Sequence, residues 1–139
     1  MKSSNSILPA TKADIPKIET LMKSEPGFWH DEWRGDVLER ALAAADGLAL
    51  VWEQAGEIEG FACAHDVGFL GYLSILIVSE KVRGLGIGRK LVLEVEQRLA
   101  TRGCAVLISD VWKDAVGFYH SLGWRPPDVV LMRKLLINQ

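Results

Sequence analysis

Residues 72–88 read Tyr-Leu-Ser-Ile-Leu-Ile-Val-Ser-Glu-Lys-Val-Arg-Gly-Leu-Gly-Ile-Gly. An apolar run, Tyr72–Val78, is followed by alternating glycines at Gly84, Gly86 and Gly88. From Gly88 to about Ala100 the apolar residues recur at helical spacing. The stretch therefore predicts a strand, a glycine loop and a helix N-terminus in succession. Backbone N–H groups at a helix start have no intrahelical partner and carry the positive end of the dipole, so such an arrangement binds phosphate.

Two widespread phosphate loops match these glycines poorly. A Walker A loop would require glycine at Arg89 and a hydroxyl side chain at Leu91. A dinucleotide fingerprint, Gly-x-Gly-x-x-Gly, would also require glycine at Arg89. Asp110 does stand at the end of the next apolar run, where a dinucleotide fold keeps its ribose-binding acid. The dinucleotide interpretation is weakened but stays open on these residues alone.

Composition indicates an ordinary globular chain. It has 139 residues, 49% of them apolar and 24% charged, and a net charge of -2, which gives no global field for nucleic acid or anionic lipid. The two cysteines, Cys63 and Cys104, lie far apart in apolar runs without metal-site spacing, which predicts buried thiols. Met1–Ser6 lacks the apolar core of a signal peptide, and no uncharged apolar run approaches the ~18 residues of a membrane span. We expect one cytoplasmic domain over residues 1–139, without metal.

Hydrophobic periodicity and the Gly and Pro positions predict the other elements. In chain order they are a short strand at Ile7–Leu8, a helix capped by Thr11 and running past Met22, a helix from Asp36 to Ala45, strands at Leu48–Trp52, Ile58–His65 and Tyr72–Val78, a helix at Gly88–Ala100, a strand at Cys104–Val111, a helix at Asp114–Ser121 and a strand at Val129–Ile137. This order predicts an α/β (α+β) fold. Its mixed central sheet is antiparallel in the N-terminal half, has one βαβ crossover at the glycine loop and carries helices on both faces. A dinucleotide domain would alternate strand and helix throughout, so the order argues against it.

Three segments together resemble one protein family. Residues 83–88 match Arg-x-x-Gly-x-Gly, which resembles the acetyl-CoA pyrophosphate loop of the GNAT superfamily of N-acetyltransferases. Leu8–Thr11 with Asp14–Ile15 resembles the opening strand and helix of that family, and Phe118–Trp124 resembles its late Phe-Tyr-x-x-x-Gly-aromatic segment. The resemblance covers nearly the whole chain. It implies the GNAT fold and an acetyl-CoA-dependent N-acetyltransferase, with acetyl-CoA as co-substrate and an amine as acceptor.

The resemblance also implies a cofactor site. Backbone N–H groups from about Gly84 to Arg89 would bind the CoA pyrophosphate, and Arg83 would add positive charge. Backbone groups of the preceding strand would bind the pantetheine arm, and the gap before the next strand would admit the thioester. The cofactor-binding candidates are Leu76, Ile77, Val78, Arg83, Gly84, Leu85, Gly86, Ile87, Gly88 and Arg89.

Acetyl transfer to an amine needs a base, because a lysine-like amine has a pKa of about 10.4. Many family members carry a carboxylate at positions that align with Tyr72 and Ser74, but this chain has no acid between Tyr72 and Val78. His65, Asp66 and Glu32 remain as bases, as does a water held by Ser74. His65 and Asp66 are adjacent in a strand and face opposite ways, so at most one of them faces the site.

Tyr119 matches the residue that often protonates the departing CoA thiolate in the family. Packing in an aromatic core is its alternative role. The missing carboxylate also leaves room for a second function class, a non-catalytic acyl-CoA-binding module.

The segment between the first two helices usually determines acceptor specificity in this fold. Here Glu25–Trp33 contains aromatic and acidic residues that suit a cationic amine, either small or on a peptide. Trp29, Glu32 and Trp33 are the substrate-binding candidates, and an ordinary surface loop is the equally open alternative. Neither nucleic acid nor membrane is expected as a partner, and a homodimer is left open.

Overall fold

The structure is a computed structural model that describes residues 6–137. The chain divides into two compact units, one ending at Ser109 and the other beginning at Asp110. The one domain predicted over residues 1–139 stays a prediction. The expectation about a signal peptide falls on Met1–Ser6, of which residues 1–5 lie outside the described residues.

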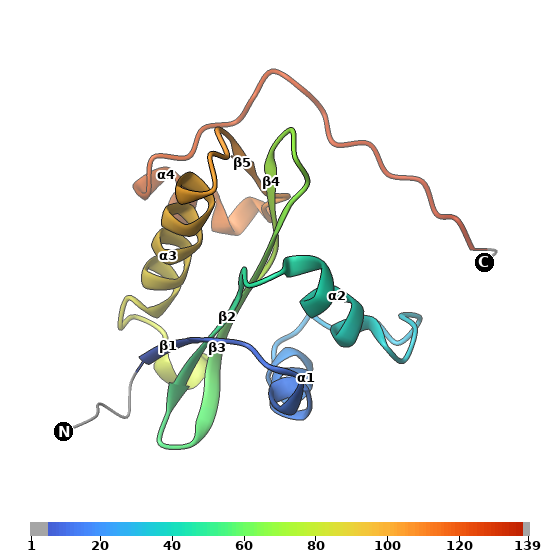
Figure 1. The fold of residues 1–139 in the computed structure, drawn as a ribbon, viewed down its shortest axis with the longest axis vertical. Helices are drawn as coiled ribbons and strands as arrows, with labels where there is room; N and C mark the ends of the chain where they lie inside the picture. Colours follow the sequence, from blue (N-terminus) through green and yellow to red (C-terminus); the bar gives the residue numbers. More distant parts are fainter. Residues whose placement is uncertain (1–5, 138–139) are drawn as a thin grey trace. The chain divides into compact units, whose positions relative to one another are not determined.

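The first unit is a mixed sheet with helices on both faces (Figure 1). Its strands are β1 (Ser6–Pro9), β2 (Ala49–Gln54), β3 (Glu57–Asp66), β4 (Gly71–Val78) and β5 (Leu107–Ile108). Its helices are α1 (Ile15–Ser24), α2 (Val37–Ala45) and α3 (Ile87–Thr101), with short 3₁₀ turns η1 (Lys12–Asp14) and η2 (Glu80–Val82). The sheet order is β1-β2-β3-β4-β5. Neighbouring strands are antiparallel from β1 to β4, and β4 and β5 are parallel.

This arrangement confirms the predicted fold class. The only parallel pair of the sheet, β4 and β5, is joined through α3, as the predicted crossover requires. A dinucleotide domain is built on a mostly parallel sheet with a reversal in strand order. The five strands of this sheet instead follow one another in chain order, so the dinucleotide interpretation fails on topology.

Opposite faces of β3 pack against different helices, α3 on one face and α2 on the other (Figure 1). A Cβ added at Gly60 would lie 3.1 Å from side-chain atoms of Ile87 and Leu91 of α3, so this strand and helix approach closely. On the other face the Cys63 Sγ lies 3.9 Å from the Ala41 carbonyl oxygen of α2. The core between these layers is mostly apolar and includes Ile18, Leu50, Phe61, Leu73, Leu91 and Val95.

Strand β5 is much shorter than the predicted Cys104–Val111. Its ladder with β4 pairs Leu107 and Ile108 with Gly71 and Tyr72, and no further. At the next residue the Ser109 hydroxyl donates to the Leu73 carbonyl oxygen, at 2.9 Å. A side-chain bond thus takes the place of a ladder bond, and the two strands part there. The prediction was too long because an apolar run does not show where a neighbouring strand stops pairing.

The second unit contains the turn η3 (Lys113–Ala115) and helix α4 (Val116–Ser121). The strand predicted at Val129–Ile137 is wrong, because residues 129–137 form neither helix nor strand. Val130, Met132 and Leu136 there are at least 80% exposed. Strand propensity describes how a segment fits a pleated surface, and it becomes a strand only where a neighbour completes the ladder. Residues 129–137 have no such ladder partner among residues 6–137.

Candidate active site

The glycine loop leads directly into α3. Gly84 and Gly86 adopt φ values of +84° and +80°, a left-handed backbone conformation that residues with a Cβ rarely adopt. Gly86 is the N-cap of α3, no side chain caps this end, and its first turn contains no acid. Arg89 and Lys90 are exposed in the same turn. The free N–H groups, the helix dipole and two cations together make this end of α3 attractive to an anion.

Arg83 is held by the protein itself. Its Nη2 donates to Glu25 Oε1, and its Nε donates to the Val78 carbonyl oxygen at 3.3 Å. The Glu25 side chain is 7% exposed, whereas that of Arg83 is 55% exposed. Glu25 Oε2 also accepts a hydrogen bond from the Glu80 backbone N–H, at 3.4 Å. The pair therefore ties the start of the glycine loop to the end of α1.

The sequence placed Glu25 in the acceptor segment and did not indicate its contact with Arg83 of the glycine loop. The residue stands before Pro26-Gly27, a context that indicates an exposed turn. Its burial is decided by Arg83, which is remote in the sequence and which the folded sheet brings beside it. No local sequence pattern around Glu25 could have predicted that its carboxylate is buried or that it pairs with Arg83.

The edge of β4 opens beside the loop. Leu76, Ile77 and Val78 form its last three residues, and β5 pairs with none of them. The side chain of Ile77 is buried in the core at 1% exposure. The backbone of this segment is therefore fixed by packing on one side of the sheet and by β3 along the other edge.

His65 and Ser74 lie together on neighbouring strands. The His65 Nε2 and the Ser74 Oγ are 2.8 Å apart, and Ser74 Oγ also lies within hydrogen-bond distance of the Cys63 carbonyl oxygen, at 3.1 Å. Burial lowers the pKa of the His65 imidazole, and the nearby Ala44 backbone partly opposes that shift. Burial also raises the pKa of the Cys63 thiol to about 11, which makes it an unreactive core group. The other thiol, Cys104, is half-buried rather than buried as predicted.

Asp66 follows His65 and is exposed at the end of β3. Its Oδ1 accepts a hydrogen bond from the Gly68 backbone N–H at 3.0 Å, so the carboxylate is engaged in the turn that leads to β4. His65 pairs with Tyr72 and Asp66 pairs with Gly71, which places their side chains on opposite faces of the sheet. Of these two candidate bases, the structure brings His65 to Ser74.

The acceptor-loop candidates form an aromatic cluster. The rings of Trp29 and Trp33 meet edge to face with centroids 5.3 Å apart, and His30 lies 5.0 Å from Trp33. His30 Nδ1 is 3.7 Å from Glu32 Oε2. The ammonium of Lys23, 5.2 Å from the Trp29 centroid, covers one face of that ring. The cluster thus already holds one cation of the protein itself.

Tyr119 belongs to the second unit, on α4. It is 9% exposed, and its ring meets those of Phe118 and Trp124 edge to face at 5.1 Å and 5.0 Å. The three rings of this segment therefore form one aromatic group, with Tyr119 at its centre. This packing is compatible with both roles predicted for the tyrosine.

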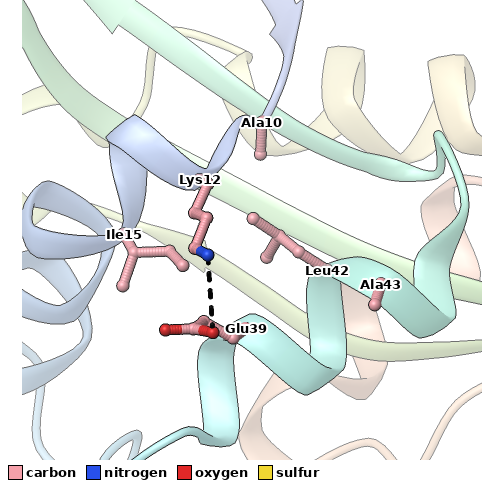
Figure 2. Close-up of a pocket in the computed structure, with 6 residues that line it drawn as sticks. All are labelled: Ala10, Lys12, Ile15, Glu39, Leu42 and Ala43. Carbon is pink, nitrogen blue, oxygen red and sulfur yellow. Dashed lines mark ion pairs between the residues drawn. The ribbon is translucent and has the colours of Figure 1, made fainter.

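A separate hollow of about 380 Å³ lies between the start of α1 and α2 (Figure 2). Ala10, Lys12, Ile15, Glu39, Leu42 and Ala43 line it. Lys12 Nζ and Glu39 Oε2, 3.9 Å apart, face each other across it. None of the predicted site residues lines this hollow.

Two further observations concern metal ligands and membrane-spanning helices. Within residues 6–137, no three His, Cys, Asp or Glu side chains gather as metal ligands would. No helix in that same range combines the length and the apolar character that crossing a membrane requires.

Comparison with known families decides the affiliation. Residues 15–124 match the family described as Acetyltransferase (GNAT) family, which spans the glycine loop, β3, β4 and the Phe118–Trp124 segment. The chain belongs to the acetyltransferase (GNAT) family. The resemblance stated from the sequence motifs is thereby confirmed.

Solved structures share the fold of this acetyltransferase-family chain at low sequence identity. A PaiA N-acetyltransferase from Thermoplasma acidophilum in complex with coenzyme A has a TM-score of 0.78 and 17% identity, covering 91% of this chain and 93% of that one. The aminoglycoside N-acetyltransferase AAC(6')-Iy in complex with CoA has a TM-score of 0.76 and 19% identity, with 99% and 98% coverage. A transcriptional regulator from Bacillus halodurans has a TM-score of 0.77 and 19% identity, with 94% and 99% coverage.

Proposed function

We propose that this acetyltransferase-family chain moves an acetyl group from acetyl-CoA to a primary amine by direct transfer. The observation that carries the proposal is the uncapped N-terminus of α3, entered through Gly84 and Gly86 beside a β4 edge that β5 leaves unpaired. A phosphate group suits the uncapped helix N-terminus, and an extended pantetheine arm suits the unpaired edge of β4. The CoA complexes of two proteins with the same fold support the choice of ligand.

The cofactor-site residues have distinct roles in this proposal. Backbone N–H groups from Gly84 to Arg89 bind the pyrophosphate, and the backbone of Leu76–Val78 binds the pantetheine arm. Arg83 contributes chiefly by positioning, because Glu25 and the Val78 carbonyl already hold its guanidinium. An N–H near Val78 stabilises the oxyanion, and the Tyr119 hydroxyl protonates the CoA thiolate.

The acceptor in this proposal is a cationic amine, on a small molecule or a peptide. Trp29 and Trp33 offer ring faces, and Glu32 offers a carboxylate. The position of Lys23 over Trp29 supports the proposal, since a ring face that attracts an internal ammonium attracts an incoming one as well. An acceptor would compete with Lys23 for that face.

One assay tests the function and its alternative. Release of the CoA thiol is measured with acetyl-CoA and a panel of spermidine, kanamycin and a lysine-containing peptide, beside binding titrations with acetyl-CoA and NAD. Turnover with any amine supports the transferase. Binding of acetyl-CoA without turnover on the panel would instead support the acyl-CoA-binding module, which the missing strand carboxylate favours.

A further inference from the structure

A β-bulge aims Ser74 away from the regular ladder. Cys63 pairs with Ile75 and Ala64 pairs with Leu73, so Ser74 is an extra residue of β4 with no opposite number on β3. The bulge comes two residues after Tyr72, the last β4 residue that pairs with β5. Bulges redirect side chains and are common next to active sites. Ser74 therefore stands where β4 and β5 part. The resemblance to the GNAT family implies that the thioester enters at this gap.

The hydrogen bonds of Ser74 and His65 leave one proton position undetermined. A serine hydroxyl has one hydrogen, and a neutral imidazole has one donor and one acceptor nitrogen. If Ser74 donates to the Cys63 carbonyl, Nε2 carries the ring proton and the buried Nδ1 lone pair has no partner. If Ser74 donates to Nε2, the ring proton moves to Nδ1, on the side of the Ala44 backbone. In the structure the buried Nδ1 makes no hydrogen bond.

A protonated ring would fit the same surroundings. Its Nε2–H would donate to Ser74 Oγ, and its Nδ1–H would face the Ala44 backbone, which favours the charged ring. Burial acts the other way and keeps the ring neutral near pH 7. The neutral ring can therefore accept one proton, and Ser74 Oγ lies within hydrogen-bond distance of its Nε2.

Ionisable neighbours of this ring lie on β3 and β4. From its own strand and from β4 the neighbours are the Cys63 thiol, 3.8 Å from Nε2, and Tyr72, whose ring centroid is 6.3 Å away. On α2, which packs on the same face, Glu39 pairs with Lys12 and Arg40 pairs with Asp36. Proton uptake by His65 is therefore not balanced by a carboxylate contact on these elements.

From this geometry we infer that Ser74 and His65 form the proton relay that deprotonates the acceptor amine. The inference rests on the proposed function and supplies the base that the carboxylate-free β4 lacks. The relay operates from the tautomer whose ring proton is on Nδ1, so that Nε2 has a free lone pair. The ammonium gives one proton to Ser74 Oγ while the hydroxyl proton of Ser74 passes to His65 Nε2. Ser74 touches the substrate, and His65 acts through Ser74.

The remaining steps balance without another reactant. The neutral amine attacks the thioester carbonyl carbon, so a C–N bond forms and the C–S bond breaks. The nitrogen loses its second proton as the CoA sulfur gains one. His65 then returns its proton to solvent, and one proton is released for each amide formed.

The test compares Ser74→Ala, His65→Gln, the double variant and the matched control His120→Gln, an exposed histidine on α4. The probes are acetyl-CoA with two acceptors: a peptide amide with a free α-amine, pKa about 7.7–8.0, and an Nα-blocked lysine amide, pKa about 10.4. We expect each single relay variant to lose about 10²-fold in kcat/KM near pH 7. The loss should shrink as pH approaches the pKa of the acceptor, sooner for the α-amine. The double variant should be no worse than either single one, because the two residues act as a unit.

Two results would overturn the relay while the proposed function stands. One is a pH–rate profile of His65→Gln parallel to that of the parent; the other is a double variant whose losses multiply. Affinity for acetyl-CoA should be unchanged in all variants, which separates the relay from a folding defect. If the parent transfers acetyl to neither amine, it is the proposed function that fails for these acceptors.

NMR titration of the three histidines examines the relay without any acceptor. His65 is assigned from the spectrum of His65→Gln. We expect His65 to stay neutral at about pH 7 and to titrate below the ordinary value of about 6.5. Ser74→Ala should move the His65 titration, and His120→Gln should not. A His65 that titrates at or above the ordinary value, or that ignores Ser74→Ala, would remove the relay.

Discussion

Two alternative roles stand for Tyr119, proton donor to the CoA thiolate or core packing, and a single substitution separates them. Its ring packs against Phe118 and Trp124, and Tyr119→Phe keeps that ring while removing only the hydroxyl. If the hydroxyl protonates the CoA thiolate, kcat should fall while acetyl-CoA affinity stays the same. General acid help is typically worth ~10²–10⁴ in rate. A CoA thiolate is a tolerable leaving group, so we expect the low end of that range or less.

The measurement for Tyr119→Phe is kcat with an amine for which the chemical step limits the rate. Acetyl-CoA titration of the variant is the control for its folding and its cofactor site. Equal kcat in variant and parent would leave Tyr119 as a core residue and the reaction without an identified acid.

His65 should make the stability of the protein depend on pH. Its pKa is lowered by burial, so the folded ring stays neutral when the unfolded ring takes up a proton. Below the ordinary value of about 6.5 the unfolded state then binds more protons, and the free energy of unfolding falls as pH falls. This stabilising contribution is complete above that value. His65→Gln removes it, so the variant should lose less stability than the parent between about pH 7.5 and about pH 5.

Urea midpoints of parent and His65→Gln, measured across that range, test the linkage. His120→Gln serves as the comparison, because His120 is exposed. Parallel pH dependence in the parent and His65→Gln would show that burial does not shift His65 in solution.

At the scale of elements, the glycine loop offers a matched pair of substitutions. Gly86 and Gly68 both have φ near +80° to +90°, and a Cβ at either would enter open space. Alanine at each should cost a similar ~1–2 kcal/mol of backbone strain. Only Gly86 lies at the proposed pyrophosphate site, where an added Cβ would meet the ligand. We expect Gly86→Ala to weaken acetyl-CoA binding about tenfold or more, equivalent to ~1.4 kcal/mol.

Calorimetric titration with acetyl-CoA measures this difference, and thermal unfolding of the apo variants measures the strain. Gly68→Ala should show the same loss of stability with normal acetyl-CoA affinity. A folded Gly86→Ala with unchanged affinity would remove the loop from the cofactor site.

Elements with strong local signals could be predicted from the sequence, and elements that depend on a partner could not. The glycines fixed the loop between β4 and α3, since few sequences tolerate positive φ at alternating positions. The length of β5 depends on Ser109, whose hydroxyl replaces a ladder bond to β4. The apolar run at Val129–Ile137 has strand propensity but no ladder partner in the described part of the chain. The strand propensity of a segment can be read from that segment alone, whereas strand pairing also depends on a second segment.

The candidate site shows the same division. The glycine loop before α3 could be predicted because positive φ values restrict the residue types, and its cofactor role stays a proposal. The pairing of His65 with Ser74 depends on a bulge that shifts the register of β3 and β4 by one residue. The burial of Glu25 depends on Arg83, far away in the sequence. Neither contact follows from any local pattern.

At the scale of the whole molecule, the net charge of the protein does not favour a polyphosphate ligand. The net charge is -2, so the chain as a whole has no field that attracts a polyphosphate. In the proposed cofactor site the attraction is local, from the α3 N-terminus with Arg89 and Lys90. Lys90 is partly engaged, since its ammonium lies 5.3 Å from the Trp52 ring centroid. Selectivity among nucleotides must therefore come from contacts beyond the pyrophosphate.

Thermal stabilisation of the whole protein tests that selectivity. A ligand that binds only the folded state adds RT ln(1 + [L]/Kd), about 2.7 kcal/mol at a hundredfold excess over Kd. Free CoA should raise the Tm nearly as much as acetyl-CoA does, because the proposed contacts are to its phosphates and pantetheine arm. NAD shares the adenosine pyrophosphate but has no pantetheine arm to lie along Leu76–Val78, so its shift should be much smaller. Gly86→Ala should reduce the shift with CoA, and Gly68→Ala should not. A shift with NAD and none with CoA would mean that the β4 edge contributes nothing to binding, and the acetyl-CoA site would have to be abandoned.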